Sequence, residues 1–128
     1  MRLLLDTHAY FWWARGYDKL SRQAASRLSE PDTEVVISAV VPWELATKNR
    51  SGKWPDAEVV LHDLETGIAR RGWKALPISL EHARLAGSLT SPHKDPFDRL
   101  LAAQAILDGL TLVTADPAFQ TFPCRTLW

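Results

Sequence analysis

Short apolar runs alternate along this chain with segments of helix length, and this alternation limits the possible folds more than any other feature. Strand-like runs lie at residues 2–5, 34–37 and 110–114, with brief extended segments near residues 75–76 and 125–127. Strands that alternate with helices favour a parallel sheet with helices on both of its faces. The sequence therefore predicts an α/β fold of three α/β/α layers around a central, mostly parallel sheet.

The helical segments between these runs have recognisable beginnings and ends. Apolar residues at helical spacing between Asp56 and Arg71 predict one helix, which Gly72 ends. Hydroxyl side chains are good N-caps because they accept a hydrogen bond from a free backbone N–H of the first turn. We expect three serines to cap helices that reach about residues 29, 49 and 89, namely Ser21, Ser38 and Ser79.

Composition restricts the class of protein. A chain of 128 residues with 46% hydrophobic residues predicts a single folded domain over residues 1–128. Basic and acidic residues number 15 each, so any site for nucleic acid must be local. Cys124 is the only cysteine, and the apolar run at residues 3–5 is too short for an export signal or a membrane span. We therefore expect a cytoplasmic protein without a membrane anchor.

Four acids stand at positions that a parallel sheet would bring together. Asp6 follows the first apolar run directly, and Asp116 follows the run at residues 110–114 after one intervening residue. Ligands of such sheets bind beyond the carboxyl ends of the strands. Glu44 and Asp98 are expected near the beginnings of helices, whose N-terminal ends point toward the same edge. All four carboxylates could therefore converge.

A cluster of this kind implies a bound cation. At an effective dielectric constant of 20, two carboxylates ~5 Å apart repel each other by roughly 3 kcal/mol. Oxygen ligands suit hard ions, so we expect Mg²⁺, with Mn²⁺ as a possible substitute, and a metal-activated water for phosphodiester hydrolysis. Thr114 and, with less support, Thr7 could orient a carboxylate or a metal-bound water.

Structural interpretations of the same residues stay open at this stage. Asp95 and Asp98 in the D-P-F-D sequence could simply cap a helix, and Glu44 could be a solvated helix residue. Asp6 and Asp116 are also good turn residues. If the acids are dispersed in space, a noncatalytic binding module remains possible.

Histidine, tryptophan and basic residues receive structural interpretations. The histidines lack metal-ligand spacing and are interpreted as surface or core side chains. Trp12 and Trp13 are most simply core or interface residues. The basic groups are interpreted as solvated helix faces unless they lie near the acids. These residues are His8, His62, His82 and His93, with the groups Lys48, Arg50 and Lys53, and Arg70, Arg71 and Lys74.

The chain resembles the bacterial VapC-type toxins of the PIN-domain family over nearly its whole length. The third of the four segments that carry the resemblance is the most specific. The segments are L-L-L-D-T-H at residues 3–8, W-E-L-A at residues 43–46, H-K-D-P-F-D-R-L-L-A-A-Q-A at residues 93–105 and L-V-T-A-D at residues 112–116.

This resemblance implies a PIN-like fold and an acidic quartet of catalytic residues, Asp6, Glu44, Asp98 and Asp116. Asp6 and Asp98 match the positions most often credited with holding Mg²⁺; we add Asp116 as a metal ligand, and Asp95 has a secondary role. The resemblance further implies cleavage of single-stranded RNA, a homodimer, and neutralisation by a VapB-type antitoxin whose C-terminal segment enters the acidic groove.

Other functions remain as alternatives. A PIN nuclease of RNA processing, without a toxin role, fits the same residues. A receiver-like phosphoacceptor domain belongs to a different class and needs adjacent acids after its first strand and a Lys after its last, but Asp6 stands alone and no Lys follows Lys94. A haloacid-dehalogenase-like phosphatase would need two acids separated by one residue, whereas Thr7 and His8 follow Asp6.

Overall fold

The apolar runs form one five-stranded sheet. In the computed structural model, which describes residues 1–128, the strands lie in the order β3-β2-β1-β4-β5 and all four pairings are parallel. Leu4 pairs with Val36 on one side and with Leu112 on the other. The predicted parallel sheet is confirmed. Its strands are β1 (Arg2–Leu5), β2 (Glu34–Ser38), β3 (Lys74–Leu76), β4 (Thr111–Val113) and β5 (Thr126–Leu127).

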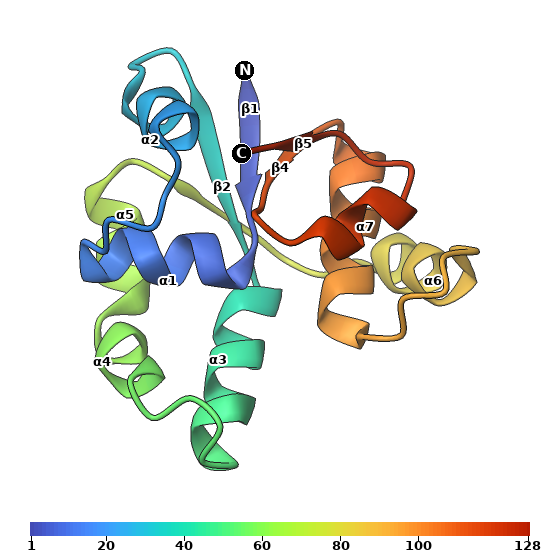
Figure 1. The fold of residues 1–128 in the computed structure, drawn as a ribbon, viewed down its shortest axis with the longest axis horizontal. Coiled ribbons are helices and arrows are strands. Elements are labelled where there is room, and N and C mark those ends of the chain that lie inside the picture. Colours follow the sequence, from blue (N-terminus) through green and yellow to red (C-terminus); the bar gives the residue numbers. More distant parts are fainter.

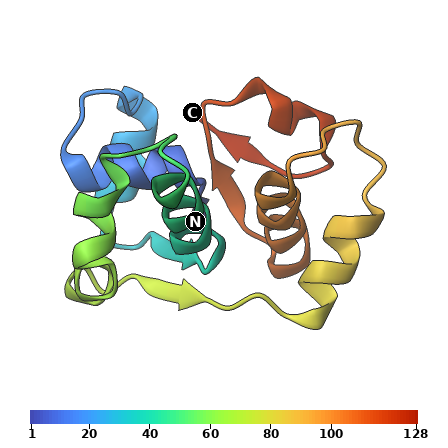
Figure 2. The same cartoon turned by 90° about the horizontal axis from the view of Figure 1, so that it is seen from below.

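Helices cover both faces of this sheet, as the alternation predicts (Figures 1 and 2). One group lies beside β1 and β2, and α6 and α7 lie on the other side. None of the helices has the length and apolar content to cross a lipid bilayer. The helices are α1 (Thr7–Arg15), α2 (Arg22–Ser29), α3 (Val40–Arg50), α4 (Ala57–His62), α5 (Leu64–Arg70), α6 (Leu80–Ser88), α7 (Pro96–Asp108) and the 3₁₀ helix η1 (Pro117–Thr121).

The period-two alternation of the strands divides the core into two clusters. Leu3 and Leu5 of β1 point into the cluster formed with α1 and its neighbouring helices, whereas Leu4 packs with Leu101 and Leu112 in the cluster under α7. All five side chains are fully buried. Because both faces of β1 are occupied, the strand is fixed in position, and so is the residue that follows it.

The helix expected over residues 56–71 is interrupted. Asp63, with φ −131° and ψ 36°, leaves the helical region and separates α4 from α5. Val60, Leu64 and Ile68 remain buried on both sides of the break. Apolar spacing cannot reveal this interruption, because two short helices preserve the same buried face as one continuous helix.

The cap expected at Ser38 is also displaced. Ser38 is the last residue of β2, and α3 begins at Val40 with Ala39 at the N-cap position and no side-chain cap. The Ser38 hydroxyl still accepts a hydrogen bond from the Val40 N–H at 2.9 Å. Glu44 consequently lies in the second turn of α3, and Pro42 falls in the first turn, where it interrupts no helical hydrogen bond.

Candidate active site

Asp6 is held at the carboxyl end of β1 by contacts on both carboxylate oxygens. Its Oδ1 accepts a hydrogen bond from the Ala9 N–H at 2.8 Å, which caps α1. Its Oδ2 accepts a hydrogen bond from the Thr114 hydroxyl at 2.5 Å. The Asp6 N–H also donates to the Val113 carbonyl at 3.1 Å, which ties the residue to β4. The carboxylate of Asp6 is therefore rigidly oriented.

The environment of Asp6 disfavours a negative charge. Burial raises its pKa to about 7, and the charges of Asp98 and Glu44 act in the same direction. Hydrogen bonds from Thr114 and Ala9 lower the pKa but do not compensate for burial. Such a raised pKa in a buried carboxylate is typical of functional sites, where a ligand or a reacting group supplies the missing stabilisation.

Glu44 is buried and fully engaged by two neighbouring side chains. The Thr7 hydroxyl donates to its Oε1 at 2.5 Å, and the Lys48 Nζ lies 2.5 Å from its Oε2. Glu44 and Lys48 are four residues apart on α3, a spacing at which the two side chains meet on one helix face. Only 4% of Glu44 is exposed, so this ion pair compensates a charge that lies largely outside solvent.

Asp98 lies in the first turn of α7, where two residues position it. The Asp95 carboxylate accepts a hydrogen bond from the Asp98 N–H at 3.1 Å and caps the helix. The His93 Nε2 lies 2.7 Å from Asp98 Oδ2. Burial raises the pKa of Asp98 to about 6, with further increases from the charges of Asp95 and Glu44. Asp98 therefore shares with Asp6 a preference for a compensating positive charge.

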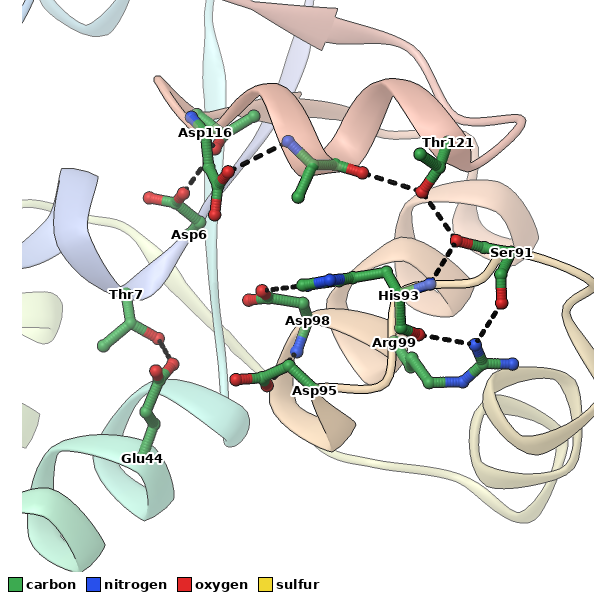
Figure 3. Close-up of polar contacts among 12 residues, drawn as sticks. Asp6, Thr7, Glu44, Ser91, His93, Asp95, Asp98, Arg99, Asp116 and Thr121 are labelled. Carbon is green, nitrogen blue, oxygen red and sulfur yellow. Dashed lines mark hydrogen bonds and ion pairs between the residues drawn. The ribbon is translucent and has the colours of Figure 1, made fainter.

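Arg99 holds the loop that carries His93. Its guanidinium donates hydrogen bonds to the backbone carbonyls of Ala86, Leu89, Ser91 and His93. Figure 3 shows the two contacts with Ser91 and His93 beside the acidic side chains. A guanidinium carries several donors in a rigid plane, so one side chain fixes three points of the loop and ties them to α6. Arg99 therefore positions His93 without facing the acids itself.

Asp116 differs from the other acids because it is exposed. Its Oδ1 accepts a hydrogen bond from the Ala118 N–H at 2.9 Å and caps η1, and its own N–H donates to the Thr114 hydroxyl at 3.0 Å. Asp116 and Asp6 both line a small cleft of about 310 Å³. Thr114 thus connects a buried acid to an exposed one at the mouth of this cleft.

The structure brings the four sequence-predicted acids to one edge of the sheet. In Figure 3, Asp6, Asp98 and Asp116 point toward the same space, and Glu44 faces it from α3. The four carboxylates do not converge on a single point. No three His, Cys, Asp or Glu side chains lie close enough together to coordinate one ion.

The donor set nevertheless fits Mg²⁺. This ion usually retains several water molecules and is bound through one or two carboxylates, so three converging protein ligands are not required. Burial raises the pKa of both the Asp6 and the Asp98 carboxylates, and the charge of Asp98 raises that of Asp6 further. A hard divalent cation between them would relieve both desolvation and repulsion.

Two residues at this site had no role in the sequence interpretation. The sequence interpretation places Lys48 on a solvated basic helix face, although its spacing of four residues from Glu44 on one helix is the signal that predicts the pair. The sequence offers no sign of the contact between His93 and Asp98, because the loop between them has no periodic pattern. Asp95 acts as a helix cap, and any further role of its carboxylate stays a prediction.

Replacing Thr114 with valine tests its influence on Asp6. The substitution keeps the side-chain shape but removes the donor to Asp6 and the acceptor for the Asp116 N–H. Side chains that orient a metal ligand typically contribute a factor of about 10–100 to activity, so we expect such a loss in the initial rate of the RNA cleavage that the family resemblance implies. Thr114→Ser should recover most of the rate. Thr111→Val, at the other end of β4, is the matched control, and equal rates for both valine variants would contradict this role.

Comparisons with known proteins agree with this architecture. The PIN domain family model matches residues 3–123. Ribonuclease VapC22 of Mycobacterium tuberculosis is 35% identical to this chain over 115 residues, which cover 89% of this chain and 86% of that protein.

Solved structures share the fold at lower identity. VapBC2 from Rickettsia felis, bound to a DNA fragment from its promoter, gives a TM-score of 0.72 at 20% identity and covers 100% of this chain and 99% of that chain. VapC20 of Mycobacterium tuberculosis, a toxin that cleaves the sarcin-ricin loop, gives a TM-score of 0.61 at 19% identity and covers 92% of each chain.

Proposed function

Because this chain belongs to the PIN-domain family, we propose that it is a metal-dependent endoribonuclease that acts as the toxin of a toxin–antitoxin pair. The observation that carries the proposal is the position of two carboxylates, the buried Asp6 and the partly buried Asp98, which face a common space and both have raised pKa values. A relative of 35% identity that is named a ribonuclease supports the same reaction.

We assign the metal-binding role to Asp6, Asp98 and Asp116, and a catalytic role to these three residues and Glu44. Bound Mg²⁺, or Mn²⁺ in its place, would supply a hydroxide-like water and neutralise charge at the scissile phosphate. Thr114 fixes Asp6, and His93 fixes Asp98, so these two carboxylates are oriented before any ligand arrives. Thr7 and Lys48 hold the Glu44 side chain in place through contacts with its two carboxylate oxygens.

The biological partners belong to the same proposal. The VapBC2 structure contains a toxin together with its antitoxin, which supports a VapB-type antitoxin as the partner of this chain. We also propose a homodimer and a cytoplasmic location, the latter supported by the single cysteine, Cys124. The receiver-like alternative is not favoured, since the PIN family model covers residues 3–123. The relatives' names also favour a toxin over a PIN nuclease of RNA processing.

Cleavage of single-stranded RNA by the purified protein tests the proposal. We expect cleavage with Mg²⁺ or Mn²⁺, none with EDTA, and recovery when excess Mg²⁺ is returned, because the carboxylates alone offer no positive charge to the leaving oxygen. Asp32→Asn is a suitable control. Asp32 is exposed and precedes β2, so it lies at the opposite edge of the parallel sheet from Asp6, which follows β1. Equal cleavage in EDTA would overturn the metal requirement, and no cleavage under any condition would overturn the nuclease assignment.

A further inference from the structure

A second cleft continues from the acidic one. The cleft that contains Asp6 and Asp116 is also lined by His8 and Trp12, and these two residues line a neighbouring cleft of about 610 Å³ as well. The second cleft lies between α1, α3 and the segment before α4. Because the two clefts share a wall, a chain-like ligand at the acids can extend into the second one.

The wall of this second cleft is aromatic. The rings of His8 and Trp54 stack with centroids 4.6 Å apart at 25°, and Trp12 lies 5.7 Å from His8 at a steeper angle. His8 is exposed, and both tryptophans are partly exposed. Trp12 and Trp54 pack partly against the core, and the exposed part of their rings, with that of His8, is aromatic surface that a ligand in the cleft can contact.

Cations surround these rings. The Lys48 Nζ lies 5.8 Å from the Trp54 ring centre, and the Lys19 Nζ lies 5.7 Å from that of Trp12. Lys53 lines the same cleft. Lys19 and Lys53 form no ion pair with a carboxylate, and Asp56 is the one acid in the lining. The cleft is therefore positive, in contrast to the acidic cleft beside it.

We propose that this aromatic and basic cleft, formed by His8, Trp12, Lys19, Lys53 and Trp54, binds a nucleotide of the RNA next to the scissile phosphate. This inference rests on the proposed ribonuclease function and adds a substrate-binding site to it. The base stacks on the aromatic side chains, and its phosphate lies against Lys19 and Lys53. The volume of about 610 Å³ lies within the range of pockets for small ligands.

The arrangement favours single-stranded RNA over duplex RNA and over a protein segment. Stacking on aromatic side chains needs a base whose face is exposed, and a duplex hides these faces. Lysines interleaved with aromatic rings fit a backbone that alternates phosphates and bases. An acidic peptide would satisfy the lysines but would leave the stacked rings without a specific partner.

Binding of a fluorescent single-stranded oligoribonucleotide in EDTA separates this site from catalysis. We expect Lys53→Glu and Trp54→Leu each to weaken binding about tenfold or more, and Trp54→Phe to retain most of it. Lys19→Ala and Lys53→Ala should each reduce the salt dependence of log K by roughly 0.7, the value for one phosphate contact on a single strand. Arg84→Glu is the charge-matched control, because Arg84 is exposed on α6, away from the cleft.

Each outcome of this experiment has one meaning. Weaker binding and a higher KM at unchanged kcat in the Lys53 and Trp54 variants support the nucleotide site. Wild-type affinity in both variants, while the protein still cleaves RNA, overturns this site and leaves the proposed function intact. Variants that bind RNA normally but lose affinity for an acidic antitoxin peptide assign the cleft to a protein and also overturn the proposal. A wild-type protein that neither binds nor cleaves RNA refutes both proposals.

Discussion

The Asp6→Asn and Asp98→Asn substitutions should each lower the rate of RNA cleavage by more than about 100-fold. This loss is larger than the loss typical of residues that only orient a metal ligand. Asparagine keeps the size of the side chain and can still accept the hydrogen bond that caps α1 or contacts His93. It removes the negative charge that would attract Mg²⁺ and one oxygen donor. The rate should therefore fall while the fold persists. Initial rates at saturating RNA over a range of Mg²⁺ concentrations measure this effect.

Asp32→Asn is the control for these two variants, since it removes a carboxylate from an exposed turn. It should cleave RNA at the wild-type rate. Circular dichroism must show that all three variants are folded, so that a loss of activity reports the site. Undiminished cleavage by both the Asp6 and the Asp98 variant would contradict the assignment.

In the absence of metal, the same Asp6→Asn substitution should stabilise the protein. The pKa of Asp6 is raised by burial to about 7, well above its ordinary value near 3.8, so the folded protein binds this proton more tightly than the unfolded chain does. Between these pKa values the folded state carries more protons, and the free energy of unfolding decreases as pH rises; above pH 7 the loss is complete. Each unit of pKa difference corresponds to about 1.4 kcal/mol, so the cost at about pH 8 is at most about 4 kcal/mol.

Thermal melting in EDTA measures this cost. At about pH 8 the Asp6→Asn variant should melt roughly 5–10 °C above the wild type, whereas at about pH 4 the two should melt at similar temperatures. Added Mg²⁺ should raise the Tm of the wild type and have little effect on the variant, because a ligand that binds only the folded state stabilises it by mass action. A variant that melts at or below the wild-type temperature at pH 8 in EDTA would show that Asp6 carries no such cost.

Features set by local chemistry were predictable from the sequence. Ser21 and Ser79 cap α2 and α6, and Asp95 with Pro96 begins α7, because capping needs only a side chain a few residues from a free N–H. The strands were predictable because runs such as Leu3 to Leu5 are apolar on both faces and so require helices on both sides.

Features set by tertiary contacts could not be predicted. The break at Asp63 leaves the apolar spacing unchanged, and η1 after Asp116 has no periodic pattern of its own. His93 meets Asp98 because Arg99 holds the loop that ends at His93 through backbone carbonyls, and such contacts leave no pattern in the sequence. The positions of the four acids at the ends of strands and the beginnings of helices were enough to predict the edge of the sheet on which they lie. The sequence did not show that Asp6 is buried while Asp116 is exposed.

A crystal of this protein grown with Mn²⁺ would test the central claim directly, because anomalous scattering locates the ion without reference to any model of the site. We expect one strong anomalous peak between the carboxylates of Asp6 and Asp98, with direct bonds to at least one of them and water-mediated contacts to the others. A peak at another part of the surface, or an empty space between these two carboxylates at saturating Mn²⁺, would contradict the account.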